Sequence, residues 1–322
     1  MLRFVAVRLL QALIVLLVMS FLIYGLIGLM PGDPIDLMIN ANPNLSPSDA
    51  ARLRALYGLD LPIWTRYLNW LAAALQGDLG YSRLISQPVL EVLKPRLLNT
   101  LLLLSISLVL ALAIAIPLGV HAARKPNSVI DTAVNLLCFA GISVPPFWLA
   151  LLFIILFSVT LGILPAGGMA PIGGDGGLAE RLPYLVMPVA TLTLVSIGGY
   201  TRFVRAAVLE QLRQDYIRTA RAKGVSERGV VWRHALRNAM IPVVTIVALG
   251  FGSLFSGALV TETMFAYLGM GKLIYDSILG NDYNIALVGL LLATLMTLAG
   301  NLLADLGYAA LDPRISFTET RT

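Results

Sequence analysis

The chain has 322 residues, of which 58% are hydrophobic and only 13% are charged. Soluble proteins carry about 25% charged residues, so this composition excludes an ordinary soluble domain and predicts an integral membrane protein. The single cysteine, Cys138, excludes a disulfide framework and a metal site built from cysteine pairs.

Six windows without charged residues are long enough to cross a bilayer, because a helical crossing needs about 20 apolar residues. In chain order they are 9–32, 97–120, 132–174, 182–201, 238–261 and 283–304. They predict an all-α integral membrane protein with six transmembrane helices. Pro145 and Pro146 are expected to kink the third helix. The fourth is the weakest candidate because Pro183, Pro188 and a Gly-Gly pair lie near its ends, but a helix bundle tolerates such residues.

The segment 33–96 follows the first window and predicts two helices. Ser46, Pro47 and Asp49 are typical of a helix start, and that helix is expected to end at Gly58. The stretch "LPIWTRYLNWLAAALQGDLG" predicts a second, amphipathic helix that ends near Gly77. Its aromatic residues suit a membrane–water interface, and the segment is expected to be either a small packed cap or a surface that meets an external partner.

The charges of the connections predict the orientation in the membrane. With a cytoplasmic N-terminus, the inside segments 1–8, 121–131, 202–237 and 305–322 hold 15 Lys and Arg against 7 Asp and Glu. The outside segments hold 8 against 11. This asymmetry predicts both termini in the cytoplasm, and it explains the net charge of +5 without a nucleic-acid partner.

The segment 202–237 holds nine basic and three acidic residues between two apolar windows. Residues 213–223 predict a short helix, Gly224 a permissive turn, and Ser226 with Glu227 the start of a second helix. Ala220 and Ala222 are small enough for another surface to approach closely. A loop that only rests on anionic lipid headgroups is the alternative, but such a loop has no need of the Ala-x-Ala-x-Gly pattern.

The stretch "DYIRTARAKGVSERGVVWRHALRNAMIPVVT" resembles the cytoplasmic coupling loop of ATP-binding-cassette (ABC) importer permeases, in the branch that imports dipeptides, oligopeptides and nickel. "GDPIDLM", "ARLRALYGLDLPIWTRYLNWL" and "NLLADLGYAALDPR" agree in order, so the resemblance covers nearly the whole chain. It implies that this loop docks into a cleft on an ATPase subunit and transmits nucleotide-driven closure to the membrane helices. The implied coupling residues are Asp215, Tyr216, Arg218, Thr219, Ala220, Arg221, Ala222, Gly224, His234, Arg237 and Asn238.

Two short stretches depart from the pattern of that family. Arg218 and Thr219 stand where many other ABC importers have Glu-Ala, and Tyr267-Leu268-Gly269 stands where this branch usually has Trp-Pro-Gly. The expected organisation is a first transmembrane helix (1–32), an extracytoplasmic helical segment (33–96), a permease core (97–311) and a cytoplasmic tail (312–322).

The resemblance implies a multi-pass protein of the bacterial inner membrane that contacts membrane lipid and works with other subunits. These are a second homologous permease, two ABC ATPases and an extracytoplasmic solute-binding protein. The chain has no Walker A sequence, so we expect ATP and Mg²⁺ to bind the ATPases, and no catalytic residue, cofactor or metal site in this chain. Glu262, Pro145 and Pro146 are candidates for the translocation path.

Peptide is the expected cargo, and nickel chelate, glutathione or another small solute are the alternatives. An ion-driven secondary transporter would carry charged residues at mid-membrane, where the six windows have none. A membrane hydrolase would need a nucleophile paired with a base, and no such pair stands out. A lipid-anchoring scaffold would use the basic loop without requiring Gly224.

Overall fold

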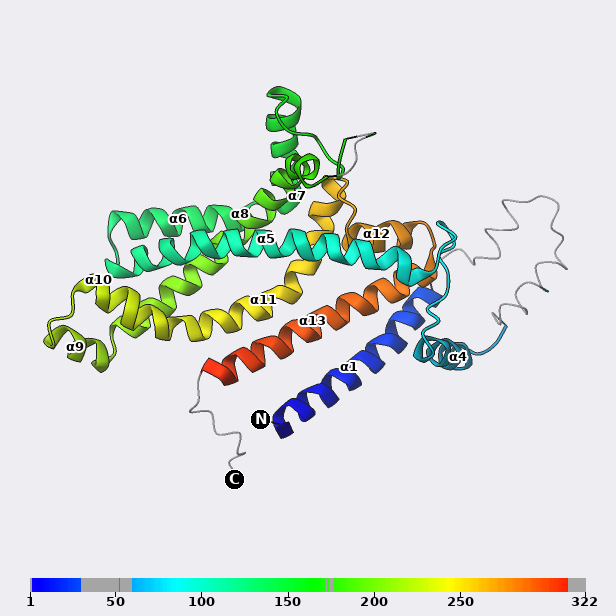
Figure 1. The fold of residues 1–322 in the computed structure, drawn as a ribbon, viewed down its shortest axis with the longest axis horizontal. Coiled ribbons are helices and arrows are strands. Elements are labelled where there is room, and N and C mark those ends of the chain that lie inside the picture. The colour runs from blue at the N-terminus through cyan, green and yellow to red at the C-terminus, as the bar shows by residue number, and fades with distance from the viewer. Residues whose placement is uncertain (1, 30–51, 53–59, 172, 174–176, 312–322) are drawn as a thin grey trace. The chain divides into compact units, whose positions relative to one another are not determined.

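The computed structural model describes residues 2–29, 52, 60–171, 173 and 177–311 of the chain (Figure 1). In these residues the only β-type pairing is an isolated bridge between Tyr81 and Pro88. The helices are α1 (Leu2–Gly28), α4 (Ile63–Leu75), α5 (Val89–Arg124), α6 (Val129–Ser143), α7 (Pro146–Phe153), η1 (Ile154–Thr160), α8 (Leu178–Leu212), α9 (Asp215–Ala222), α10 (Glu227–Gly229), η2 (Val230–Ala235), α11 (Leu236–Met264), α12 (Met270–Leu279) and α13 (Tyr283–Leu311). The fold class predicted from composition, nearly all-helical, is therefore confirmed for the described residues.

The described helices divide between two compact units. The first comprises Met1–Leu97 and Leu273–Leu295, and the second comprises Leu98–Lys272 and Met296–Thr322. The predicted organisation into a first transmembrane helix, an extracytoplasmic segment, a permease core and a tail stays a prediction.

In the first unit, α4 packs against the C-terminal half of α1. The buried Tyr67 ring meets Phe21 edge-on with ring centroids 5.2 Å apart, and its hydroxyl shares a 2.7 Å hydrogen bond with Ser20. At the end of α4, Gly77 has a φ of +88°, and the next amide, that of Asp78, donates a 3.0 Å bond to the carbonyl of Ala73. The chain therefore leaves α4 through a left-handed glycine cap, which confirms the predicted helix end near Gly77.

Also in the first unit, the segment 80–84 is tied to the start of α13. Ser82 donates a 2.5 Å hydrogen bond to the buried carboxylate of Asp282, and the backbone N–H of Leu84 donates a 3.2 Å bond to the same oxygen. The side-chain amide of Asn284 donates a 3.0 Å bond to the carbonyl of Tyr81. These bonds fix the connection that leads from α4 into α5.

In the second unit, α8 is packed closely by its neighbours because small residues face it. A Cβ added to Gly198 of α8 would lie 2.6 Å from the carbonyl oxygen of Cys138 in α6. A Cβ on Gly119 of α5 would lie 2.8 Å from the carbonyl oxygen of Thr201. A larger side chain at either glycine would therefore push two helices apart.

The fourth window forms a long helix despite its prolines and its Gly-Gly pair, as expected. α8 runs unbroken over 35 residues with Pro183 and Pro188 inside it, and Pro188 is buried. A proline removes one backbone hydrogen bond, but neighbouring helices in a bundle compensate for that loss. The Gly-Gly pair likewise lies within the helix, where Gly198 permits close packing rather than a break.

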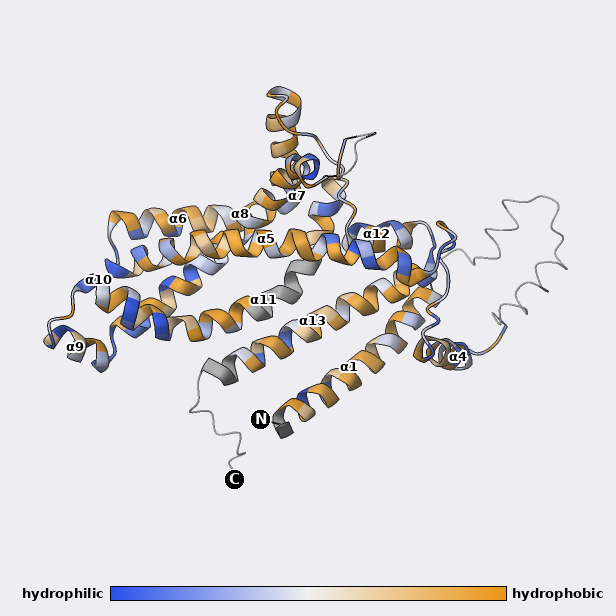
Figure 2. Ribbon diagram, in the orientation of Figure 1, coloured by the Kyte–Doolittle hydropathy of each residue, from blue (hydrophilic) through white to orange (hydrophobic). Residues whose placement is uncertain are grey.

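A compact apolar core joins four helices at one end of the second unit. It consists of Val120, Ala123, Val204, Ala207, Val208, Val231, Ala239 and Val243. These residues come from α5, α8, η2 and α11, so the core positions the segment that connects α8 to α11. In Figure 2 hydrophobic residues dominate α1 and α13, whereas hydrophilic residues gather around α9 and α10.

Among the described residues, four helices are long and apolar enough to cross a membrane: α1, α5, α8 and α13. A fifth crossing is possible by length and composition if α6, α7 and η1 form one broken span, although its halves are bent by 94°. The expected kink at the two prolines is therefore a sharp bend, with Pro145 capping α7 and Pro146 opening it. The count of six crossings stays a prediction.

Some sequence predictions lie outside the described residues. The helix expected from Ser46 to Gly58, the stretch "GDPIDLM" and the tail 312–322 are among them.

Candidate functional site

The candidate site is the basic hairpin, which we define as residues 213–237. Its first arm is α9, which begins after an extended residue, Gln214, and its second arm starts with α10, whose N-cap Ser226 accepts a 3.3 Å bond from the N–H of Gly229. The predicted pair of helical arms around Gly224 is confirmed. The second arm is not a separate helix, however, because α10 continues through η2 into α11 and Pro242 lies inside α11.

The turn between the two arms is a Schellman motif centred on Gly224. This glycine has a φ of +78°, and its N–H donates a 2.9 Å bond to the carbonyl of Arg221. The N–H of Val225 donates a 3.2 Å bond to the carbonyl of Ala220, and these two side chains pack in one apolar cluster. A Cβ at Gly224 would meet nothing within 4 Å. The requirement for glycine within this chain therefore comes from the left-handed backbone and not from lack of space.

The inner face of α9 closes the hairpin. Ile217 and Ala220 are buried against Val230 and Ala235 of the second arm. The expectation that Ala220 meets another surface is therefore corrected, since its small side chain lets the two arms of the hairpin itself approach. Ala222 remains exposed.

The outer face of α9 is exposed and polar, with a net positive charge. Its exposed residues are Asp215, Tyr216, Arg218, Thr219, Arg221 and Ala222, with Lys223 following the helix. Arg221 donates hydrogen bonds of 2.7 and 3.3 Å to the carboxylate of Glu227, so an ion pair bridges the turn. The Arg221 guanidinium lowers the pKa of the Glu227 carboxyl. The turn is thus reinforced by charge as well as by backbone geometry.

The remaining implied coupling residues lie on the second arm. Arg237 is exposed, while His234 and Asn238 are half-buried. Between them and the turn, the exposed ring of Trp232 lies edge-on to His121 of α5, with centroids 6.2 Å apart. The second arm is therefore in contact with α5 as well as with α9.

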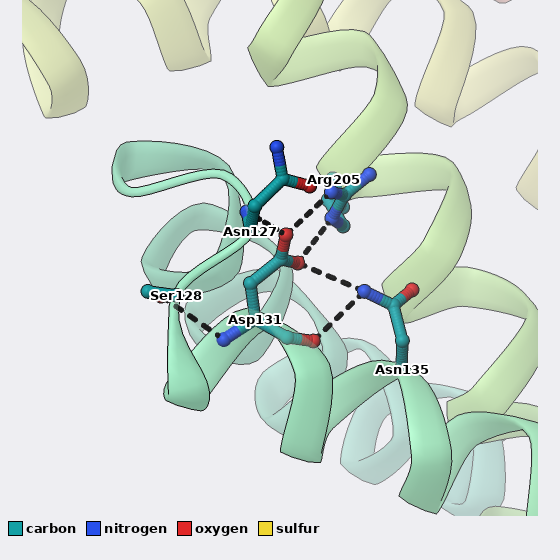
Figure 3. A network of polar contacts seen from close by, with 5 residues as sticks. All are labelled: Asn127, Ser128, Asp131, Asn135 and Arg205. Atoms are coloured by element: carbon teal, nitrogen blue, oxygen red, sulfur yellow. Dashed lines mark hydrogen bonds and ion pairs between the residues drawn. The ribbon is translucent and has the colours of Figure 1, made fainter.

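A buried polar network holds the helix that carries the hairpin, and it was missed from the sequence (Figure 3). Asp131, in the first turn of α6, accepts bonds of 2.5 and 2.7 Å from the guanidinium of Arg205 in α8. The same carboxylate accepts 2.8 Å bonds from the backbone N–H of Asn127 and from the side-chain amide of Asn135. Ser128 caps α6 by accepting a bond from the Asp131 N–H.

The ion pair between Asp131 and Arg205 lies seven residues before the end of α8. Only 3% of the Asp131 side chain and 22% of the Arg205 side chain are exposed. A bidentate, buried pair of this kind fixes one register between two helices, because each alternative leaves a buried charge without its partner. The sequence signal was a Ser-x-x-Asp helix start at the edge of an apolar window.

The candidate pathway residue Glu262 is buried and held by hydrogen bonds within the protein. Its side chain is fully buried near the end of α11, where it accepts a 2.5 Å bond from Thr100 and a 3.0 Å bond from the backbone N–H of Lys272. Thr100 accepts a 2.8 Å bond from the N–H of Met270, so both side chains serve the first turn of α12. A Cβ on Gly269 would collide with the Glu262 carboxylate. The geometry thus explains Glu262 as a partner of a helix N-terminus, and its place on the translocation path stays a prediction.

The turn at Tyr267-Leu268-Gly269 is well defined despite its unusual sequence. Ala266 has a φ of +47°, and the buried Tyr267 donates its N–H to the carbonyl of Glu262 at 2.8 Å. The Tyr267 hydroxyl donates a 3.1 Å bond to the carbonyl of Asn99. A tyrosine therefore anchors this turn through its hydroxyl as well as its ring.

The other two pathway candidates stand at the bend between α6 and α7. Pro145 is exposed and Pro146 is half-buried. Their position explains the bend, while a role in translocation stays a prediction.

Two family descriptions match nearly the whole chain. Residues 115–317 match "Binding-protein-dependent transport system inner membrane component", and residues 1–104 match the N-terminal region of the same kind of membrane component. The first match includes the basic hairpin and the Asp131–Arg205 pair.

Similar curated proteins agree in length as well as sequence. The chain is 39% identical over 311 residues to the oligopeptide transport system permease protein AppB of Bacillus subtilis, covering 96% of this chain and 98% of AppB. It is 35% identical over 336 residues to the dipeptide transport system permease protein DppB of Escherichia coli K12, covering 98% and 99%. A solved structure of the MetNI methionine ABC transporter in an inward-facing conformation matches with a TM-score of 0.53 at 19% identity, covering 69% of this chain and 99% of the matched chain. That structural likeness concerns the fold alone.

Proposed function

The chain belongs to the family of inner membrane components of binding-protein-dependent transport systems, and we infer that it is the permease subunit of an ABC importer for peptides. The observation that carries this conclusion is full-length similarity to one oligopeptide and one dipeptide permease, at 39% and 35% identity. The protein is a multi-pass membrane protein, and its role is transport rather than catalysis.

For its topology we propose six crossings with both termini in the cytoplasm of a bacterial cell. The crossings are α1, α5, the broken pair α6 with α7 and η1, α8, α11 and α13. The distribution of Lys and Arg supports this orientation, which places the basic hairpin in the cytoplasm and α4 outside.

The basic hairpin is the coupling element in this proposal. The exposed face of α9 enters a cleft on an ATPase subunit, while its buried face is held by the second arm. The first arm is preceded by α8 and the second arm continues into α11. The apolar core where these helices meet the hairpin also includes residues of η2 and α5. A displacement of α9 is therefore passed to two membrane helices together.

The energy comes from other subunits. The sequence contains no Walker A motif, so ATP and Mg²⁺ bind to two ATPase subunits, and a second homologous permease completes the pathway. A solute-binding protein delivers peptide to the outer face. ATP binding favours the closed ATPase pair. Because the closed pair binds one conformation of the coupling hairpins more tightly than the other, it shifts the population of permease conformations.

Reconstitution in proteoliposomes tests this function. The chain, a second permease, the ATPases and the binding protein are expected to accumulate a labelled dipeptide only with ATP and Mg²⁺ present. The purified chain alone is expected to release no phosphate above a buffer blank. Uptake driven by an ion gradient without ATP would contradict the proposal and favour a secondary transporter.

A further inference from the structure

The short helix α4 has three chemically distinct sides. Successive residues of a helix turn by about 100°, so residues at spacings of three, four and seven share a side. One side, with Ile63, Tyr67, Trp70 and Ala74, faces α1 or is half-buried. A second side, which we call the apolar stripe, consists of the exposed residues Trp64, Leu68, Ala72 and Leu75.

The third side of α4 is polar and lies beyond the apolar stripe, away from α1. It includes the exposed residues Asn69 and Gln76. Arg66, the only charged residue of α4, lies about 200° around the helix from Trp64. No charge therefore interrupts the apolar stripe, in which Trp64, Leu68 and Leu75 expose 63%, 59% and 81% of their surface.

The height at which α4 meets α1 indicates what covers the stripe. Tyr67 bonds to Ser20, and Ser20 lies eight residues before Gly28, the last residue of α1. At about 1.5 Å per residue this contact lies roughly 12 Å below the end of the span. The surface of α1 at that level is itself apolar and exposed, at Phe21 and Leu22.

From these observations we propose that α4 lies in the plane of the membrane surface, with the apolar stripe inserted among lipid acyl chains. An interfacial helix typically sinks its apolar face about 5–10 Å into the headgroup boundary, slightly less than the roughly 12 Å between the Ser20–Tyr67 contact and the end of α1. Trp64 suits the headgroup level, and the polar side that carries Asn69 faces water. Because the exposed surface of α1 at the level of this contact is apolar as well, lipid is the occupant that the surroundings provide.

The proposal is tested with spin labels on the full-length chain in phosphatidylcholine nanodiscs. In a Cys138→Ser background, single cysteines replace Leu68 or Leu75 on the stripe, and Asn69 or Gln76 on the polar side. Each stripe position has an adjacent control position that is also exposed. Collision rates with oxygen, which concentrates in lipid, and with a water-soluble nickel chelate are measured for each label.

The labels at Leu68 and Leu75 are expected to favour oxygen over the nickel chelate severalfold relative to those at Asn69 and Gln76. Equal nickel accessibility at all four positions would place the stripe in water and overturn the proposal. Repeating the measurement on the assembled transporter tests whether another protein, rather than lipid, covers the stripe. Loss of both oxygen and nickel collisions at Leu68 and Leu75 would show that a protein covers the stripe, and would also overturn it.

Discussion

The helices α4 and α9 are built by the same local rules but present different chemistry to their surroundings. Each is short, and each ends in a glycine with positive φ, at Gly77 and Gly224. Each buries one face against its own unit. The exposed surface of α4 includes an apolar stripe, whereas the exposed face of α9 is polar with a net positive charge. The capping rule therefore specifies how such a helix ends, whereas its exposed side chains indicate whether lipid or a protein subunit lies beside it.

The anchoring of the two regions also differs. α9 follows α8 in the chain, and α8 is bound to α6 by the buried ion pair of Asp131 and Arg205. α4 is held to α1 by hydrogen bonds of the Tyr67 hydroxyl with Ser20 and with the carbonyl of Leu17, together with ring contacts. Breaking each anchor in turn tests whether this difference is real.

The largest effect is expected for Asp131→Ala. It leaves a mostly buried guanidinium without its partner, a change that typically costs about 3–5 kcal/mol. Denaturant unfolding of the purified chain in detergent measures the loss, and Glu210→Ala, which removes an exposed acid from α8, the helix of Arg205, is the control. A loss no greater than that of the control would show that the pair does not anchor α8.

A smaller effect is expected for Gly224→Val and Gly77→Val. Both positions are left-handed and unobstructed, so each substitution should cost about 1–2 kcal/mol through backbone strain alone. Peptide uptake by the assembled transporter should fall sharply only for Gly224→Val, because only that turn lies in the hairpin that we propose to be the coupling element.

Asparagine separates the two reasons for glycine at position 224. Gly224→Asn should retain most of the uptake, since asparagine tolerates the left-handed conformation. If this variant assembles with the ATPase subunits yet is as inactive as Gly224→Val, the glycine serves close approach of a partner rather than the turn.

A loss of about 1 kcal/mol is expected for Tyr67→Phe, which removes the hydroxyl that bonds to Ser20 and to the carbonyl of Leu17 in α1. The same unfolding assay measures it. Tyr81→Phe, at an exposed ring in the same unit, is the control. Equal stability of the two variants would mean that ring packing alone holds α4.

The smallest effect concerns the exposed pair of Arg221 and Glu227. The pKa of Glu227 is lowered, so the stabilisation is present above the ordinary pKa of a glutamate and is lost as the pH falls through the lowered pKa. Glu227→Gln should therefore cost roughly 0.2–1 kcal/mol at neutral pH and nothing in strong acid. A difference that persists unchanged in acid would rule out the ion pair as its cause.

The features that could be predicted from the sequence are those with local causes. Gly77 and Gly224 stop helices, Ser226 starts one, and uninterrupted apolar runs mark the long helices. The inward orientation of Ala220 was not predictable, because it depends on Val230 and Ala235 packing against it from the other arm.

Long-range contacts account for the other differences. Asp131 and Arg205 are 74 residues apart, and neither has a local pattern that names the other as its partner. The continuity of α8 through Pro183 and Pro188 likewise depends on helices that pack beside it. The buried carboxylate of Glu262 accepts a hydrogen bond from Thr100, which lies 162 residues away in the sequence.

The central claim is that the exposed face of α9 is gripped by an ATPase subunit, and photo-crosslinking in native membranes tests it most directly. A benzophenone amino acid replaces Tyr216 on α9, or Trp64 on α4 as the internal comparison, in the assembled transporter. The probe at position 216 is expected to crosslink to the ATPase subunit, and the probe at position 64 is expected to yield lipid adducts only. Lipid adducts alone from position 216 would contradict it.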